Sequence, residues 1–146
     1  MSKSNALENE LLLHLLQNAD IALIGDATGV RGSSTAGSLY VSLHTADPGE
    51  AGDQTTSEAT YTSYARVAVV RSAGGWTVST NTGTNAALVT FPAATAGTNT
   101  VTYFAVGTSI SGAGKLLFSG ALTASLAVSA GITPVFAIGA LSISED

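Results

Sequence analysis

The sequence contains no cysteine, and only 10% of its 146 residues are charged. Without cysteine the chain has no disulfide framework, no thiolate metal site and no cysteine nucleophile. About 25% of the residues of a typical soluble domain are charged. A protein that stands alone in solution usually depends on surface charge, so we expect part of this surface to be shared with partners. The alternative is a β-protein rich in Ser and Thr that is soluble by itself.

Basic residues are especially few, and the net charge is −5. Phosphate recognition needs a clustered positive surface, because counterion release supplies most of the affinity. The five basic side chains are instead scattered: Lys3, Arg31, Arg66, Arg71 and Lys115. We therefore expect no nucleic-acid partner.

Long hydrophobic runs are also missing. The apolar block Leu11–Ile24 is interrupted by polar residues and is shorter than the roughly 20 residues that cross a bilayer. Glu8 and Glu10 occupy the place where a signal peptide would carry basic residues. The sequence predicts no membrane partner.

Groups for catalysis or metal binding are sparse. Ser42, His44 and Asp47 are the one trio that could be imagined as a triad, but no G-x-S-x-G turn accompanies them. Two histidines without an H-x-H or H-x-x-x-H pair do not support a zinc site. The acidic residues between 47 and 58 lack EF-hand spacing, so a solvated loop is favoured over a calcium site. We expect no enzymatic activity, no catalytic or metal-binding residue and no cofactor.

Residues 4–24 carry the pattern of an amphipathic helix. Asn5 and Glu8 have the spacing of a capping box, and Gly25 is expected to end the helix. The leucine-rich stripe must pack on something, either the open end of the β-domain or a neighbouring subunit. As a partner interface we predict Leu7, Leu11, Leu12, Leu15, Leu16 and Leu23.

The chain after residue 38 is typical of β-structure. The run Leu39–His44 alternates as a strand and ends at Asp47-Pro48-Gly49, where Pro48 cannot join a ladder. Short strands follow, separated by Gly, Pro and Asn, and Gly74-Gly75 predicts a hairpin that joins the strands on either side. The predicted fold is mainly β: a single antiparallel β-sandwich or jelly-roll-like domain over residues 39–146. An N-terminal arm, the amphipathic helix and a loop rich in Gly and Ser occupy residues 1–38.

Several segments together resemble a widespread family of small virion proteins of tailed bacteriophages. These segments are YVSLHTADPGE (Tyr40–Glu50), YARVAV (Tyr64–Val69), Phe91-Pro92-Ala93, Val106-Gly107-Thr108 and Ser119–Leu122. They occur in order across nearly the whole chain. The resemblance implies a structural component of a phage particle without an agreed active site.

The resemblance leaves two roles open. Members are often labelled tail fibre or tail proteins, whereas small β-sandwich proteins of similar size act as cement on capsids. We expect a capsid decoration protein on the outside of the phage head, made in the host cytoplasm, which stabilises contacts between subunits of the major capsid protein. Self-association as a dimer or trimer is the simplest arrangement. The alternative is a structural protein of a tail fibre, tail tip or baseplate.

Overall fold

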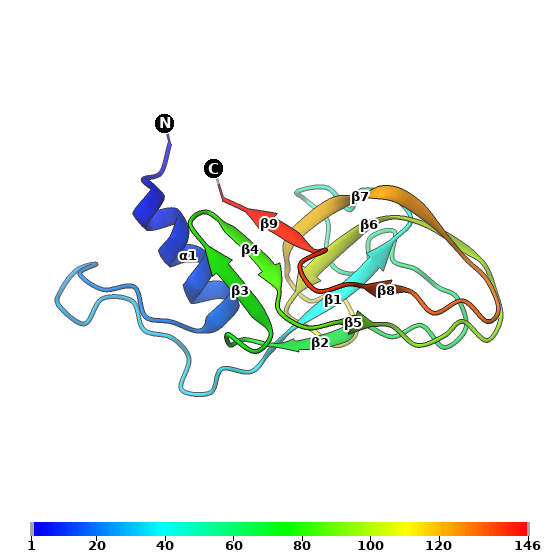
Figure 1. Cartoon of the computed structure of the whole chain (residues 1–146), viewed down its shortest axis with the longest axis horizontal. Coiled ribbons are helices and arrows are strands. Elements are labelled where there is room, and N and C mark those ends of the chain that lie inside the picture. The colour runs from blue at the N-terminus through cyan, green and yellow to red at the C-terminus, as the bar shows by residue number, and fades with distance from the viewer. Residues whose placement is uncertain (1, 146) are drawn as a thin grey trace. The chain divides into compact units, whose positions relative to one another are not determined.

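The protein is mainly β, with one helix near the N-terminus, in a computed structural model that describes residues 2–145 (Figure 1). The elements are α1 (Asn5–Gln17), β1 (Ser38–His44), β2 (Val67–Val70), β3 (Trp76–Ser79), β4 (Thr82–Asn85), β5 (Val89–Thr90), β6 (Asn99–Gly107), β7 (Leu116–Val128), β8 (Val135–Phe136) and β9 (Ser142–Ser144). The predicted class, antiparallel β-structure behind an N-terminal helix, is confirmed.

The chain forms two compact units. The first contains the residues up to Ser38, Val69–Leu88 and the residues from Ala137 on, and the second contains Leu39–Ala68 and Val89–Phe136. The sequence predicted an N-terminal region over residues 1–38 and a single β-domain over residues 39–146. The sequence did not predict that two later segments would join the N-terminal region.

The first unit packs α1 on a three-stranded sheet with the order β3-β4-β9. Leu12 and Leu16 are fully buried in it, and Trp76 at the start of β3 is equally buried. A Cβ atom added to Gly83 of β4 would lie 2.4 Å from a methyl group of Leu16. Glycine at this position therefore lets the leucine stripe lie directly on the sheet.

The helix is shorter than the sequence predicted. Ser4 is the N-cap, one residue before the predicted Asn5, and its hydroxyl accepts from the N–H of Leu7 at 3.3 Å. Asn18 ends the helix in a left-handed conformation with φ 60°, well before Gly25. The Arg71 guanidinium donates to the carbonyls of His14 and Leu15, where the helix dipole favours a cation.

A four-stranded sheet with the order β2-β1-β6-β7 supplies most of the second unit, and the division between the units falls within β2. β1 and β6 pair antiparallel, with Leu43 opposite Phe104. A two-stranded ribbon of β5 and β8 packs on this sheet. The ring of Phe136 in β8 contacts the rings of Phe91 and Phe104 edge-on, with the ring centroids 6.1 Å apart in each pair. This packing of sheet on ribbon within the unit is the sandwich arrangement.

The prediction of a hairpin at Gly74-Gly75 is wrong. β2 and β3 lie in different sheets, and β3 pairs instead with β4, which the sequence left unassigned. The tight turn there, in which the N–H of Gly75 donates to the carbonyl of Ser72, redirects the chain without aligning its flanking strands. The hairpin turn lies at Thr80 and Asn81, and Thr80 takes a positive φ of 53°.

Truncation of the leucine stripe tests this packing. We expect Leu16→Ala to lower the free energy of unfolding by about 3 kcal/mol, since it opens a cavity in a fully buried site. The matched control is Leu23→Ala, whose parent side chain is 80% exposed and whose effect should stay within about 0.5 kcal/mol. Urea unfolding followed by circular dichroism measures both, and equal effects would contradict the packing.

Candidate functional site

Ser42 and His44 do meet, but in the core of the second unit. The Ser42 hydroxyl lies 2.8 Å from His44 Nε2, and both residues are 0% exposed. His44 Nδ1 lies 2.8 Å from the carbonyl oxygen of Thr56, which can only accept, so Nδ1 carries the proton and Nε2 accepts from Ser42. His44 Nδ1 is bound by a backbone carbonyl, whereas a catalytic triad would have the carboxylate of Asp47 at that position. The trio is a structural tie between β1 and the following loop.

A buried ion pair lies beside this tie. Arg66 donates from Nε to Glu58 Oε1 at 2.6 Å and from Nη2 to Glu58 Oε2 at 2.8 Å. The Arg66 side chain is 3% exposed and that of Glu58 is 16% exposed. Hydrogen bonds and charge from Glu58 raise the pKa of Arg66 further, so the guanidinium stays protonated. A bidentate pair of this kind fixes orientation as well as charge.

The ion pair also holds two other parts of the second unit. Arg66 donates to the carbonyls of Ser109 and Gly112 in the loop between β6 and β7. The Tyr64 hydroxyl donates to Glu58 and accepts from the N–H of Leu43 in β1. Burial raises the pKa of Tyr64 far above its usual range, so this hydroxyl remains a donor. The sequence analysis missed this network, although Glu58 and Arg66 are charges of opposite sign eight residues apart.

Three of the four carboxylates between residues 47 and 58 have separate partners. Asp47 accepts from the N–H of Gly49, Asp53 accepts from the N–H and hydroxyl of Thr55, and Glu58 binds Arg66. Those hydrogen bonds lower the pKa of Asp53. Across residues 2–145, no three His, Asp or Glu side chains come together as a possible metal site. The loop is shaped by turn-capping and ion pairing.

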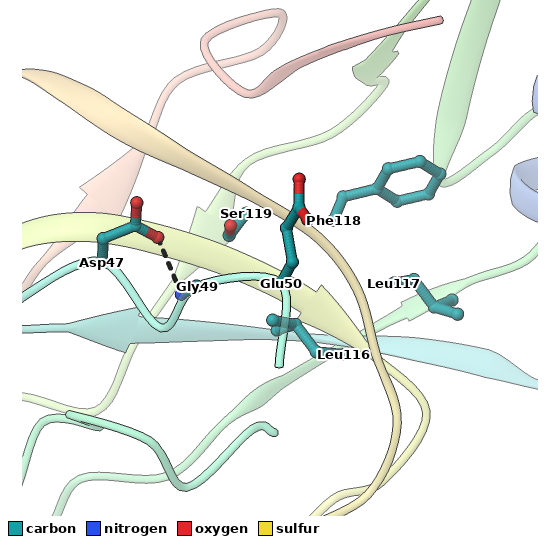
Figure 2. Close-up of a pocket in the computed structure, with 7 residues that line it drawn as sticks. All are labelled: Asp47, Gly49, Glu50, Leu116, Leu117, Phe118 and Ser119. Atoms are coloured by element: carbon teal, nitrogen blue, oxygen red, sulfur yellow. Dashed lines mark hydrogen bonds between the residues drawn. The ribbon is translucent and has the colours of Figure 1, made fainter. Parts of the chain in front are cut away.

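One open pocket of about 370 Å³ lies where this loop meets the start of β7 (Figure 2). The carboxylates of Asp47 and Glu50 lie on one side of it, and apolar side chains of β7 lie on the other. Its lining residues are Asp47, Gly49, Glu50, Leu116, Leu117, Phe118 and Ser119. The carboxylates of this pocket can pair with a basic side chain, and its apolar residues can contact the hydrocarbon part of the same side chain. The lining residues contain no nucleophile paired with a base.

The six leucines predicted as a partner interface are divided by the structure. Leu12 and Leu16 are 0% exposed and pack within their own unit, so they are unavailable to a partner and that part of the prediction is corrected. Leu7, Leu11 and Leu15 are half-buried. Leu23 is 80% exposed, because the helix ends before it. Within the described chain no helix is long and apolar enough to span a membrane.

Leu23 lies at the tip of a small ordered loop. Ile21 and Val30 exchange backbone hydrogen bonds of 2.9 and 2.8 Å that close it. The carboxylate of Asp26 accepts from the N–H groups of Thr28 and Gly29 and from the Thr28 hydroxyl, and these bonds lower its pKa. Leu23 has a positive φ of 64°, which is costly for a residue with a branched side chain.

The side chain next to Leu23 is also exposed. Ile24 is 49% exposed, and the sequence analysis placed it only in the interrupted apolar block. The loop therefore presents two adjacent apolar side chains to solvent. We name Leu23 and Ile24 the loop tip.

Comparison with known families decides the class of protein. A family model described as Podophage GP4 fiber I protein gp80 matches residues 2–144. The chain belongs to this family. No curated protein gives a significant match.

Membership of the gp80 fiber family confirms the prediction of a phage virion structural protein, located in the virion. The match extends over both compact units, so the loop tip, the ion pair and the pocket all lie within it.

The buried histidine predicts a pH effect on stability. Burial lowers the pKa of His44 below its ordinary value of 6.5. On acidification the unfolded chain therefore binds a proton at this residue more readily than the folded protein does. We expect the free energy of unfolding to fall as the pH drops from 7 through 6.5 towards 5. Urea titrations at a series of pH values measure the slope.

His44→Gln is the control for this effect. The variant should be less stable at pH 7, because one of the two hydrogen bonds of His44 is lost. Its stability should nevertheless change little between pH 7 and 5, where Asp26 and Asp53, with pKa values lowered from 3.8, do not titrate. An unchanged slope in the variant would show that another group is responsible.

Proposed function

We propose that this chain is a non-enzymatic structural subunit of a virion fibre, which acts through contacts with neighbouring virion proteins. The observation that carries the proposal is the match of residues 2–144 to a fiber protein family. The polar networks are consistent with a structural role, because the Ser42–His44 pair is out of contact with solvent and the bidentate ion pair orders loops.

The loop tip is the proposed contact with the virion. Leu23 and Ile24 leave a substantial apolar surface in water, and burying it against a partner is favourable by roughly 25 cal/mol per Å². The loop is already ordered by the Ile21–Val30 pairing and the Asp26 turn, so binding it costs little conformational entropy. The partner surface at this position would be an apolar pocket on another structural protein of the particle.

Decoration of the phage head is the second candidate. A fibre shaft is repetitive, whereas this sequence lacks an internal repeat and folds into compact units. A connecting or decorating module fits these features better than a shaft. In the head role the chain would lie on the capsid exterior and bind the major capsid protein.

Copy number separates the two roles. For a fibre component we expect quantitative mass spectrometry of purified virions to give a small fixed number of copies per particle, and gold-labelled antibodies to mark the fibres. Hundreds of copies with label spread over the head would replace the fibre role by head decoration. Absence of the chain from purified virions would contradict both the fibre role and head decoration.

A charge placed on the loop tip tests the proposed contact. We expect Leu23→Asp to fold normally, since the side chain is 80% exposed, but to reduce incorporation into virions several-fold because burying an unpaired carboxylate is unfavourable. Ile138→Asp is the control, because Ile138 is 67% exposed and lies outside the loop between residues 21 and 30. Complementation of a phage lacking the gene, followed by immunoblotting of particles, measures incorporation. Equal incorporation of both variants would remove the loop tip from the contact.

A further inference from the structure

The longest strand of the protein lies at the edge of its sheet. β7 pairs with β6 on one side, and the sheet order β2-β1-β6-β7 leaves its other side open. Within residues 2–145 no other segment donates to or accepts from the backbone on that side. β7 has 13 residues, of which only Val128 is buried. An open row of N–H and C=O groups is a template for another strand.

The other edge strands are short, and most are protected. β2 has four residues between Arg66 and Arg71, and the three-residue β9 is followed by Glu145. β8 has two residues and directly follows Pro134. β3 has four residues and contacts α1. Charges, prolines and short length are the devices that prevent edge-to-edge pairing.

β7 has none of these devices within its length. Its sequence LLFSGALTASLAV holds no charged residue and no proline, and Lys115 lies just before it. No carboxylate occurs between residues 59 and 144, although the chain carries ten acidic side chains. Two copies of an acidic protein repel each other least where carboxylates are absent, and the carboxylates that line a pocket with β7 are those of Asp47 and Glu50.

The register of β7 indicates which part can pair. Its pairing with β6 is regular from Phe118 to Ala121, opposite Val106 to Tyr103, and register shifts occur on both sides of this stretch. Asp47 and Glu50 lie near the beginning of β7 at the pocket, so the end of the stretch at Ala121 is the less acidic side. Gly120, in the middle of the stretch, lets the Phe104 ring of β6 lie close against β7, since an added Cβ atom would come within 2.8 Å of that ring.

We propose that β7 is a self-association edge, at which the segment Phe118–Ala121 pairs antiparallel with the same segment of a second copy. Antiparallel pairing of identical strands satisfies a two-fold axis, in which each copy donates and accepts the same hydrogen bonds. The pairing would join two four-stranded sheets into one continuous sheet. This inference rests on the proposed assembly role and names the partner as a second copy of this chain.

Lysines on the exposed positions of β7 test the pairing. Ala121 and Thr123 are exposed, so Ala121→Lys/Thr123→Lys should leave the thermal unfolding temperature nearly unchanged. We expect sedimentation equilibrium to show that the purified wild-type chain dimerises, and that the variant raises the dissociation constant at least about tenfold, because lysines on an edge strand prevent edge-to-edge pairing.

The matched control places the same charges on another strand. Thr77→Lys/Ser79→Lys adds lysines at exposed positions of β3 and should dimerise as the wild type does. Hydrogen exchange adds a backbone readout: outward-facing amides of Phe118–Ala121 should become more protected as the wild-type concentration rises.

Three results would overturn the proposal: a wild-type chain that is monomeric throughout the measured range, a dimer that survives the β7 lysines, or amides of β7 whose exchange is independent of concentration. None of these changes the copy number in virions, so failure of the pairing is distinguishable from failure of the fibre role.

Discussion

The second unit depends on one buried ion pair, between Glu58 and Arg66. The Arg66 side chain is 3% exposed, and its charge is acceptable there only because Glu58 and two backbone carbonyls surround it. Removing one partner of such a pair typically costs about 3–5 kcal/mol, since the other charge is left buried and uncompensated. Through these bonds the loop after β1, the start of β2 and the loop between β6 and β7 are held together. The Tyr64 hydroxyl adds β1 to the same network.

The surfaces proposed for assembly are the loop tip in the first unit and the β7 edge in the second. The clamped loop between β6 and β7 determines where β7 begins, and so where the edge of the sheet is presented. In the first unit Arg71 has the corresponding role, because it caps the end of α1 and approaches Ala36 and Ser33 in the segment after the loop tip. Each of these arginines satisfies backbone carbonyls that would otherwise lack a donor. Two of the five basic side chains of this chain therefore have largely structural tasks.

A surface with few charges suits a protein that works inside an assembly. Members of a virion structural family meet their partners at high local concentration, where apolar and main-chain contacts suffice and long-range charge steering is unnecessary. The loop tip and the β7 edge are proposed as two different kinds of contact, one a pair of side chains and one a row of backbone groups. A subunit with two separate contacts can bind a neighbour and a second copy at once, which raises the stability of the whole through effective concentration.

The sequence by itself determined the class of fold, the helix near the N-terminus and membership of a phage structural family, because these depend on local periodicity and on residues in a recognisable order. Its leucine stripe predicted that Leu12 and Leu16 would be buried, but not that the chain's own β3-β4-β9 sheet would bury them. The exposed Leu23 differs from its buried neighbours only because Asn18 ends the helix. His44 met Ser42 as the alternation of a strand predicts, yet Thr56 took the place of Asp47. The tertiary structure decided these partners, since strand pairing and burial join segments far apart in the chain, and periodicity carries no information about which segments will meet.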